Sequence, residues 1–208
     1  MNMLLKSAIA AAVFAVPSIA AASTWEIDSA HSSAKFTVKH MMITNVAGEF
    51  GSVTGTVNLD DKDPSKTTIT ASVDTTTINT NQPKRDAHLK SPDFFDVEKY
   101  PAMTFKSKSV KADGKDKFKV TGDLTLHGVT KPVTLDVESS STEIKDPWGG
   151  TRRGASATTK LNRKDFGLTW NQALEAGGVA VGDEVKVMID LELVKKDEAP
   201  AAAAPAKK

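Results

Sequence analysis

Apolar and polar residues alternate with a period of two in several runs between residues 23 and 194 of this chain. In the clearest runs, apolar residues occupy alternate positions of 118–126, 133–137 and 185–193, and shorter runs cover 36–38, 69–73 and 103–105. Alternation of this kind places one face of an extended strand in a core and the other face in water. It is typical of an antiparallel sheet, so the sequence predicts an all-β fold.

Turn signals separate these runs and indicate how the strands are arranged. They fall at Asp60–Pro64, Ala112–Gly114, His127–Gly128, Asp146–Gly150 and Gly177–Gly178. About eight strands over roughly 170 residues are typical of a β-sandwich or a closed barrel. The runs over 48–60 and 115–127 are long, and long strands favour a barrel, which leaves no exposed edge. We therefore expect an extended antiparallel barrel of eight strands.

One segment, QPKRDAHLKSPDFFD over residues 82–96, breaks the alternation. Pro83 suits the first turn of a helix, and the pair Ser91–Pro92 favours its end. The sequence therefore predicts a short helix followed by a turn at Phe94 and Phe95. Within an all-β chain, a helix with two adjacent aromatic residues is expected to cover the mouth of the barrel.

Both ends of the chain differ in composition from the predicted barrel, which spans residues 23–194. Residues 1–22 contain Lys6, an apolar run from Ala8 to Val16 and three alanines before Ser23, which is the pattern of a cleavable secretory signal peptide. The alternative is a buried N-terminal helix. The order of the three regions favours the signal peptide, and with it export to the periplasm. Residues 195–208 are mostly Ala, Pro and Lys, and predict a disordered tail.

The composition excludes several classes of function. The 27 basic and 26 acidic residues give a net charge of +1, which argues against binding to nucleic acid or to a membrane surface by charge. There is no cysteine, which excludes disulfides and thiolate metal sites. The four histidines lack the spacing of a local metal site, and common catalytic motifs are missing. We therefore expect neither an enzyme nor a metal protein, and no cofactor.

Three polar side chains are candidates for recognising a polar group at the end of an apolar pocket. His40 follows Phe36 and Val38 in phase, so it is either a hydrogen-bonded core histidine or a polar anchor. Arg85 and His88 share one face of the predicted helix. They form either a solvated polar face with salt bridges to acidic loops, or a site at the barrel mouth for an anionic or polar head group of a ligand. Arg152 and Arg153 follow a Gly–Gly turn and could serve the same role, although such arginines are more often simply exposed.

Large apolar residues near loops and strand ends are candidates for the wall of the pocket. Periodicity cannot separate a pocket wall from an ordinary core, because both face inward. The residues assigned to the wall are Phe36, Val38, Met42, Phe50, Phe94, Phe95, Met103 and Phe105.

Several sequence blocks between residues 24 and 194 resemble blocks of the YceI-like proteins, and they follow one another along the chain as they do in that family. The most specific is GDLTLHGVTKP over 122–132, and others are DSAHS over 28–32, RDAHLKS over 85–91, RKDFG over 163–167 and VGDEV over 181–185. The resemblance implies a lipocalin-like barrel in a periplasmic protein that holds an amphiphile. It also implies ligands of the polyisoprenoid class, and prenyl quinones and fatty acids or amides are further ligands associated with the family. Members of the family often form homodimers.

The residues themselves are compatible with such a ligand. An eight-stranded barrel has room for one small ligand. Each buried methylene contributes about 0.8 kcal/mol, so a long apolar tail needs few polar contacts. Our first hypothesis is a carrier or sequestering protein for a polyisoprenoid-type lipid. The alternatives are a structural or stress-response interaction protein with a filled barrel, and an enzyme acting on prenyl lipids.

Overall fold

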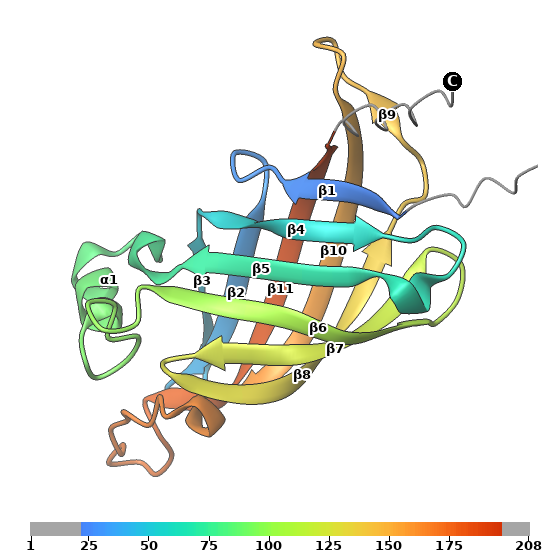
Figure 1. Ribbon diagram of the computed structural model, residues 1–208. Helices are drawn as coiled ribbons and strands as arrows, with labels where there is room; N and C mark the ends of the chain where they lie inside the picture. Colours follow the sequence, from blue (N-terminus) through green and yellow to red (C-terminus); the bar gives the residue numbers. More distant parts are fainter. Residues whose placement is uncertain (1–21, 197–208) are drawn as a thin grey trace, which may run out of the picture.

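The structure, a computed structural model, describes residues 22–196 as an antiparallel β-barrel with one short α-helix (Figure 1). Almost all of the expected signal peptide and of the expected tail lies outside the described residues. Among the described residues, no helix is long and apolar enough to cross a membrane. The strands are β1 (Ser23–Ile27), β2 (Ser33–His40), β3 (Thr44–Phe50), β4 (Val53–Leu59), β5 (Thr68–Asp74), β6 (Ala102–Ala112), β7 (Lys117–Leu126), β8 (Val129–Ser139), β9 (Ile144–Lys145), β10 (Thr151–Asn162) and β11 (Val181–Lys195).

Eight of the strands form a closed ring, which confirms the predicted barrel. The order around the ring is β11, β1, β4, β5, β6, β7, β8 and β10. It closes where β10 pairs with β11, in a register that runs from Arg152 opposite Val194 to Asn162 opposite Glu184. Closure leaves the ring without a free edge along this seam.

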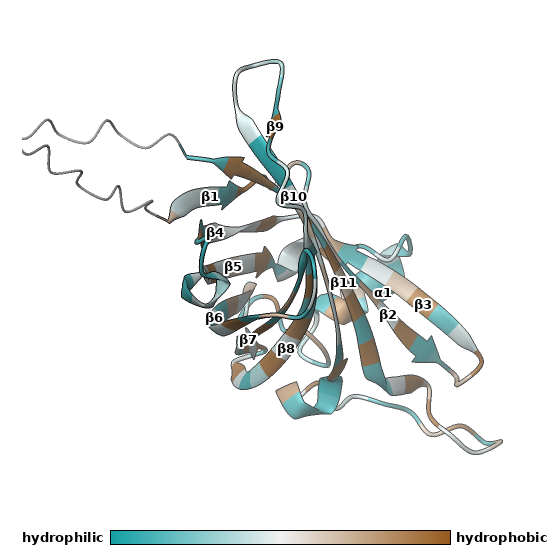
Figure 2. Cartoon of the chain, turned by 90° about the vertical axis from the view of Figure 1, so that its right-hand side faces the viewer, coloured by the Kyte–Doolittle hydropathy of each residue, from teal (hydrophilic) through white to brown (hydrophobic). Residues whose placement is uncertain are grey.

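The strand β11 is shared between the ring and a hairpin that lies outside it. Residues 193–195 of β11 pair with β1, whereas residues 181–190 pair with β2. Strand β3 then pairs with β2, and this β2–β3 hairpin splays away from the ring (Figure 2). The short β9 pairs with the start of β10.

The turn between β7 and β8 shows how local sequence sets the register of the ring. His127 and Gly128 both have positive φ, at 52° and 75°. This is the backbone of a two-residue type I′ hairpin, whose twist matches that of the flanking strands. The predicted turn at these two residues is therefore confirmed, and it fixes Leu126 opposite Val129.

The predicted helix is also present, as α1 (Pro83–Lys90). The side chain of Gln82 caps its first turn by accepting from the backbone N–H of Lys84 at 2.7 Å, and Pro83 occupies a position that needs no donor. The helix stands at one end of the barrel (Figure 1). Short 3-10 helices, η1 (Pro64–Lys66), η2 (Thr75–Thr77) and η3 (Arg163–Phe166), occupy connections between strands.

Candidate ligand-binding cavity

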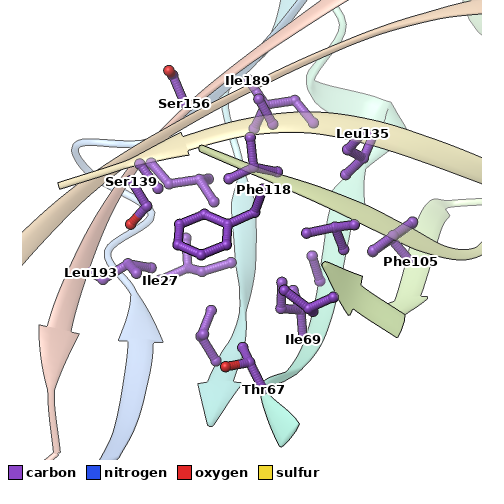
Figure 3. A pocket seen from close by; sticks show the side chains of 18 of the residues that line it. Ile27, Thr67, Ile69, Phe105, Phe118, Leu135, Ser139, Ser156, Ile189 and Leu193 are labelled. Atoms are coloured by element: carbon purple, nitrogen blue, oxygen red, sulfur yellow. The ribbon is translucent and has the colours of Figure 1, made fainter. Parts of the chain in front are cut away.

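The ring encloses a cavity of about 400 Å³, within the range of small-molecule pockets in proteins. Figure 3 shows the side chains of Ile27, Ile69 and Phe118, from three strands, converging on this space. Most of the wall is aliphatic or aromatic. Its apolar residues include Val53, Val57, Val73, Met103, Phe105, Val120, Leu124, Leu135, Val187, Ile189, Leu191 and Leu193.

Many of these wall residues are only half-buried although they point into the barrel. Val73, Phe118, Leu135 and Ile189 belong to this class. Their inward faces border open space rather than another side chain, so they lack the packing contacts of a filled core. An apolar space of this kind holds water poorly and accepts an apolar guest.

The end of the barrel beside α1 and η3 is closed by apolar packing. Leu126, Phe166 and Leu168 are buried there, and Phe95 and Met103 pack against them. Arg163 holds the closing segment in place, because its buried guanidinium donates from Nε to the carbonyl of Gly182 at 2.9 Å. It also donates to the carbonyl of Leu168. Burial lowers the pKa of this arginine.

The opposite end of the cavity is polar. Charged and hydroxyl side chains gather there from the loop between β4 and β5, the loop between β6 and β7, the end of β8 with the segment that follows it, and the start of β10. They are Asp60, Asp61, Asp116, Ser139, Ser141 and Arg153. The cavity is therefore amphipathic along its length, with an apolar closed end and a polar end.

Arg153 is the central polar group of this end. It is 7% exposed, and its guanidinium lies over the ring of the fully buried Trp25, with 5.1 Å between Cζ and the ring centre. Nη1 and Nη2 donate to the two carboxylate oxygens of Asp61 at 2.8 and 3.1 Å, and Nη2 also reaches Glu143 at 3.3 Å. Its Nε is buried without an acceptor among the described residues.

Of the residues predicted to form the wall, Met103 and Phe105 line the cavity. Three others form aromatic contacts at the α1 end, where Phe50 lies 5.8 Å from Phe36 and 5.4 Å from Phe95 between ring centres. This cluster packs the β2–β3 hairpin against the segment after α1. Phe94 is buried against His88 and Trp170.

Val38, His40 and Met42 do not line the cavity. They belong to the β2–β3 hairpin, in the part that lies beyond the ring. His40 is exposed and Met42 is 54% exposed, so the expectation that His40 faces the interior is wrong. The physical reason is that alternation gives the face of a strand but not whether that face is enclosed by other strands.

Arg85 and His88 also lie away from the cavity, at its closed end. Arg85 donates from Nε to Thr80 Oγ1 at 2.7 Å and from Nη2 to the carbonyl of Thr80 at 2.8 Å. His88 Nε2 lies 2.9 Å from a carboxylate oxygen of Asp93. Both side chains therefore tie α1 to its own surroundings.

Alternation within β10 is the signal that separates Arg153 from Arg152, which the sequence otherwise offers as equal alternatives. Arg153, Ala155, Ala157, Thr159 and Leu161 occupy alternate positions and line the cavity. The signal is weak because most of these side chains are small. Small residues give little contrast in hydrophobicity between the two faces of a strand.

Arg152 points to the outside, where it joins three carboxylates. It pairs with Asp28 and Asp146, each at 2.7 Å, and with Glu192. Asp28, Glu192 and the neighbouring His31 lie close enough to resemble a metal site, but the guanidinium already supplies the cation. Hydrogen bonds from His31 and then Arg152 lower the pKa of Asp28 to about 2.

Comparison with known proteins agrees with this architecture. The YceI-like domain family matches residues 25–193. Protein YceI of Escherichia coli O157:H7 is 42% identical over 151 residues, covering 72% of this chain and 78% of that protein. The crystal structure of BcnA from Burkholderia cenocepacia superposes with a TM-score of 0.70 at 22% identity, covering 80% of this chain and 98% of BcnA.

A second solved structure shares the fold. A polyisoprenoid binding domain from Saccharophagus degradans superposes with a TM-score of 0.61 at 16% identity, covering 83% of this chain and 98% of that domain. The family match spans nearly all of the described barrel, and the identity to protein YceI extends over most of it. The chain therefore belongs to the YceI-like family.

Proposed function

We propose that this protein binds a polyisoprenoid-type amphiphilic lipid inside its barrel and carries or sequesters it in the periplasm. The observation that carries the proposal is the predominantly apolar cavity of about 400 Å³ inside the ring of strands. A branched, unsaturated hydrocarbon chain matches a wall made of aliphatic and aromatic side chains. The polyisoprenoid binding domain with the same fold supports this ligand class.

The apolar wall accounts for most of the affinity that such a ligand would have. Burial of about ten carbons of the tail would contribute roughly 8 kcal/mol, before the entropic costs of association. Polar contacts then serve mainly to orient the head of the lipid. A cavity built for this purpose needs no catalytic cluster, and we propose a binding protein rather than an enzyme.

The periplasmic location rests on the sequence of residues 1–22, which has the order of regions found in a secretory signal peptide. A prenyl lipid is poorly soluble in the aqueous periplasm. A barrel that encloses the tail removes its apolar surface from water, which is the physical basis of a carrier.

Native mass spectrometry of the protein purified from its own periplasm tests the proposal. We expect a stoichiometric adduct, and solvent extraction should release a lipid with an isoprenoid chain. The mass of the processed chain also tests cleavage after Ala22. A bare chain that stays bare after incubation with prenyl lipids would overturn the carrier function and favour an interaction protein. Release of a chemically altered lipid would instead indicate an enzyme.

A further inference from the structure

The amphipathic cavity fixes the direction in which a lipid would lie. At the α1 end the cavity wall is apolar and includes Met103, Leu126 and Val133. These residues pack with the buried Phe166 and Leu168. All the acidic and basic residues that line the cavity lie at the other end. Burial of a polar head against the apolar end would leave its hydrogen-bonding groups unpaired, which is costly. The head of the lipid therefore belongs beside Arg153, and the tail extends toward α1.

One buried donor at the polar end has no acceptor within residues 22–196. Among these residues Arg153 Nε makes no hydrogen bond, while the two terminal nitrogens of the same guanidinium donate to Asp61. A buried donor without an acceptor is uncommon in proteins, because leaving it unpaired costs free energy. A ligand atom that accepts this hydrogen bond would remove the cost.

The charges at this end restrict what that acceptor can be. Arg153 is the one basic residue among the described residues that line the cavity, and Asp61 already neutralises it at 2.8 Å. Asp60 and Asp116 add two further carboxylates to the same end. A phosphate or carboxylate head would approach these like charges in surroundings that water screens poorly.

We infer that the cavity selects a lipid with an uncharged oxygen head, a carbonyl or hydroxyl group, which accepts a hydrogen bond from Arg153 Nε, and that it rejects the corresponding phosphate. This inference rests on the proposed function and deepens it. Arg153 provides the hydrogen bond, and the Asp61 carboxylate provides the discrimination against anions. Ser139 and Ser141 offer neutral hydroxyl groups at the same end.

Three probes with the same branched C20 carbon skeleton separate the contribution of the head from that of the tail: the hydrocarbon phytane, the alcohol phytol, and phytyl phosphate. Each displaces a fluorescent prenyl probe from the protein in equilibrium competition. For the wild type we expect phytol to bind about tenfold more tightly than phytane, because a hydrogen bond from a charged donor contributes about that much to the affinity. We expect phytyl phosphate to bind at least about tenfold more weakly than phytol.

Two variants assign these preferences to residues. Arg153→Met should reduce the ratio of phytol affinity to phytane affinity from about tenfold to about one. Asp61→Asn keeps the size of the side chain, and should strengthen binding of phytyl phosphate about tenfold relative to phytol. Arg152→Met is the matched control, because the neighbouring Arg152 points out of the barrel to Asp28 and Asp146, and it should leave all three affinities unchanged.

The outcomes distinguish this inference from the proposed function. If phytol and phytane bind the wild type equally, or if phytyl phosphate binds best, the lipid-binding function stands and the head-group inference is overturned. Equal weakening of all three probes by Arg153→Met would show that this arginine only closes the barrel, which also overturns it. If none of the probes binds, the proposed function fails and the inference fails with it. Asp61→Asn provides the test if Arg153→Met does not fold.

Discussion

The ring of Phe105 on β6 packs directly against the backbone of Gly122 on β7. A Cβ atom at position 122 would stand 2.5 Å from Phe105 Cζ and 2.5 Å from the carbonyl oxygen of Lys106. Position 122 therefore requires glycine because neighbouring atoms come too close to admit a Cβ atom, and not because its backbone has a positive φ. Its missing side chain makes the space in which Phe105 forms part of the cavity wall.

Gly122→Ala should consequently destabilise the barrel and disturb ligand binding together. Overpacking of a close contact costs about 1–3 kcal/mol, and movement of the Phe105 ring into the cavity would reduce its volume. Urea denaturation and lipid competition measure the two effects. Gly154→Ala on β10 is the matched control, since a Cβ there meets nothing within 4 Å. Equal stability of the two variants would contradict the packing described here.

Ala71→Phe should block the cavity while leaving the barrel folded. Ala71 lines the cavity from β5, and a phenyl ring there would occupy space that two or more lipid carbons need. The loss of about two methylene contacts predicts at least about tenfold weaker lipid binding. Thr70→Phe, at the adjacent exposed position, should leave affinity unchanged. Unaltered binding by Ala71→Phe in lipid competition would place the ligand outside the barrel.

The strands and α1 could be predicted from the sequence because their signals are local. Alternation sets the inward face of β7, and Gln82 with Pro83 sets the start of α1. Which strands belong to the closed ring could not be predicted from the sequence, because this depends on which strand pairs with each part of β11. Phe36 and Phe105 carry the same alternating pattern, yet only Phe105 lines the cavity inside the ring.

The position of the polar end of the cavity could not be predicted from the sequence, for a related reason. Besides His40, the sequence predicts head-group contacts at α1, because Arg85 and His88 stand together on a helix expected at the barrel mouth. The α1 end is instead packed shut, and these two side chains are bound locally to Thr80 and Asp93. Arg153 and Asp61 meet from positions 92 residues apart, and no local pattern signals that contact.

The pair formed by His31 and Asp28 predicts a pH-dependent stability. His31 Nδ1 lies 2.9 Å from Asp28 Oδ2, and this hydrogen bond is the main cause that raises the pKa of His31 above 6.5. Because the folded pKa is raised, the contribution of His31 is complete below pH 6.5 and is lost as pH rises through the folded pKa. The pKa of Asp28 is lowered to about 2, so its contribution is complete above pH 3.8 and is lost as pH falls toward 2.

His31→Gln should therefore lower Tm more at pH 5 than at pH 8.5, by removing a contribution that the wild type itself loses at high pH. Thermal unfolding of both proteins at the two pH values measures the difference. In an Asp28→Asn background, the same histidine substitution should have an effect that depends less on pH, because Glu192 is then the remaining carboxylate that favours protonated His31. A wild-type advantage that is equal at both pH values would show that protonated His31 does not stabilise the fold.

Gly128→Ala should be more damaging than the same substitution at Gly149, and the comparison separates backbone strain from packing. Both glycines have positive φ, at 75° and 91°, so both substitutions pay about 1 kcal/mol or more for a left-handed backbone. A Cβ at Gly128 would also stand 2.6 Å from Tyr100 Cε1, whereas at Gly149 it meets nothing within 4 Å. We expect Gly128→Ala to lower the free energy of unfolding by an additional amount of about 1–3 kcal/mol, the cost of overpacking a close contact.

In a Tyr100→Ala background the two glycine substitutions should lower the free energy of unfolding equally, which a double-mutant cycle from denaturant unfolding measures. An additional loss that persists without the Tyr100 ring would assign the cost to the hairpin turn itself.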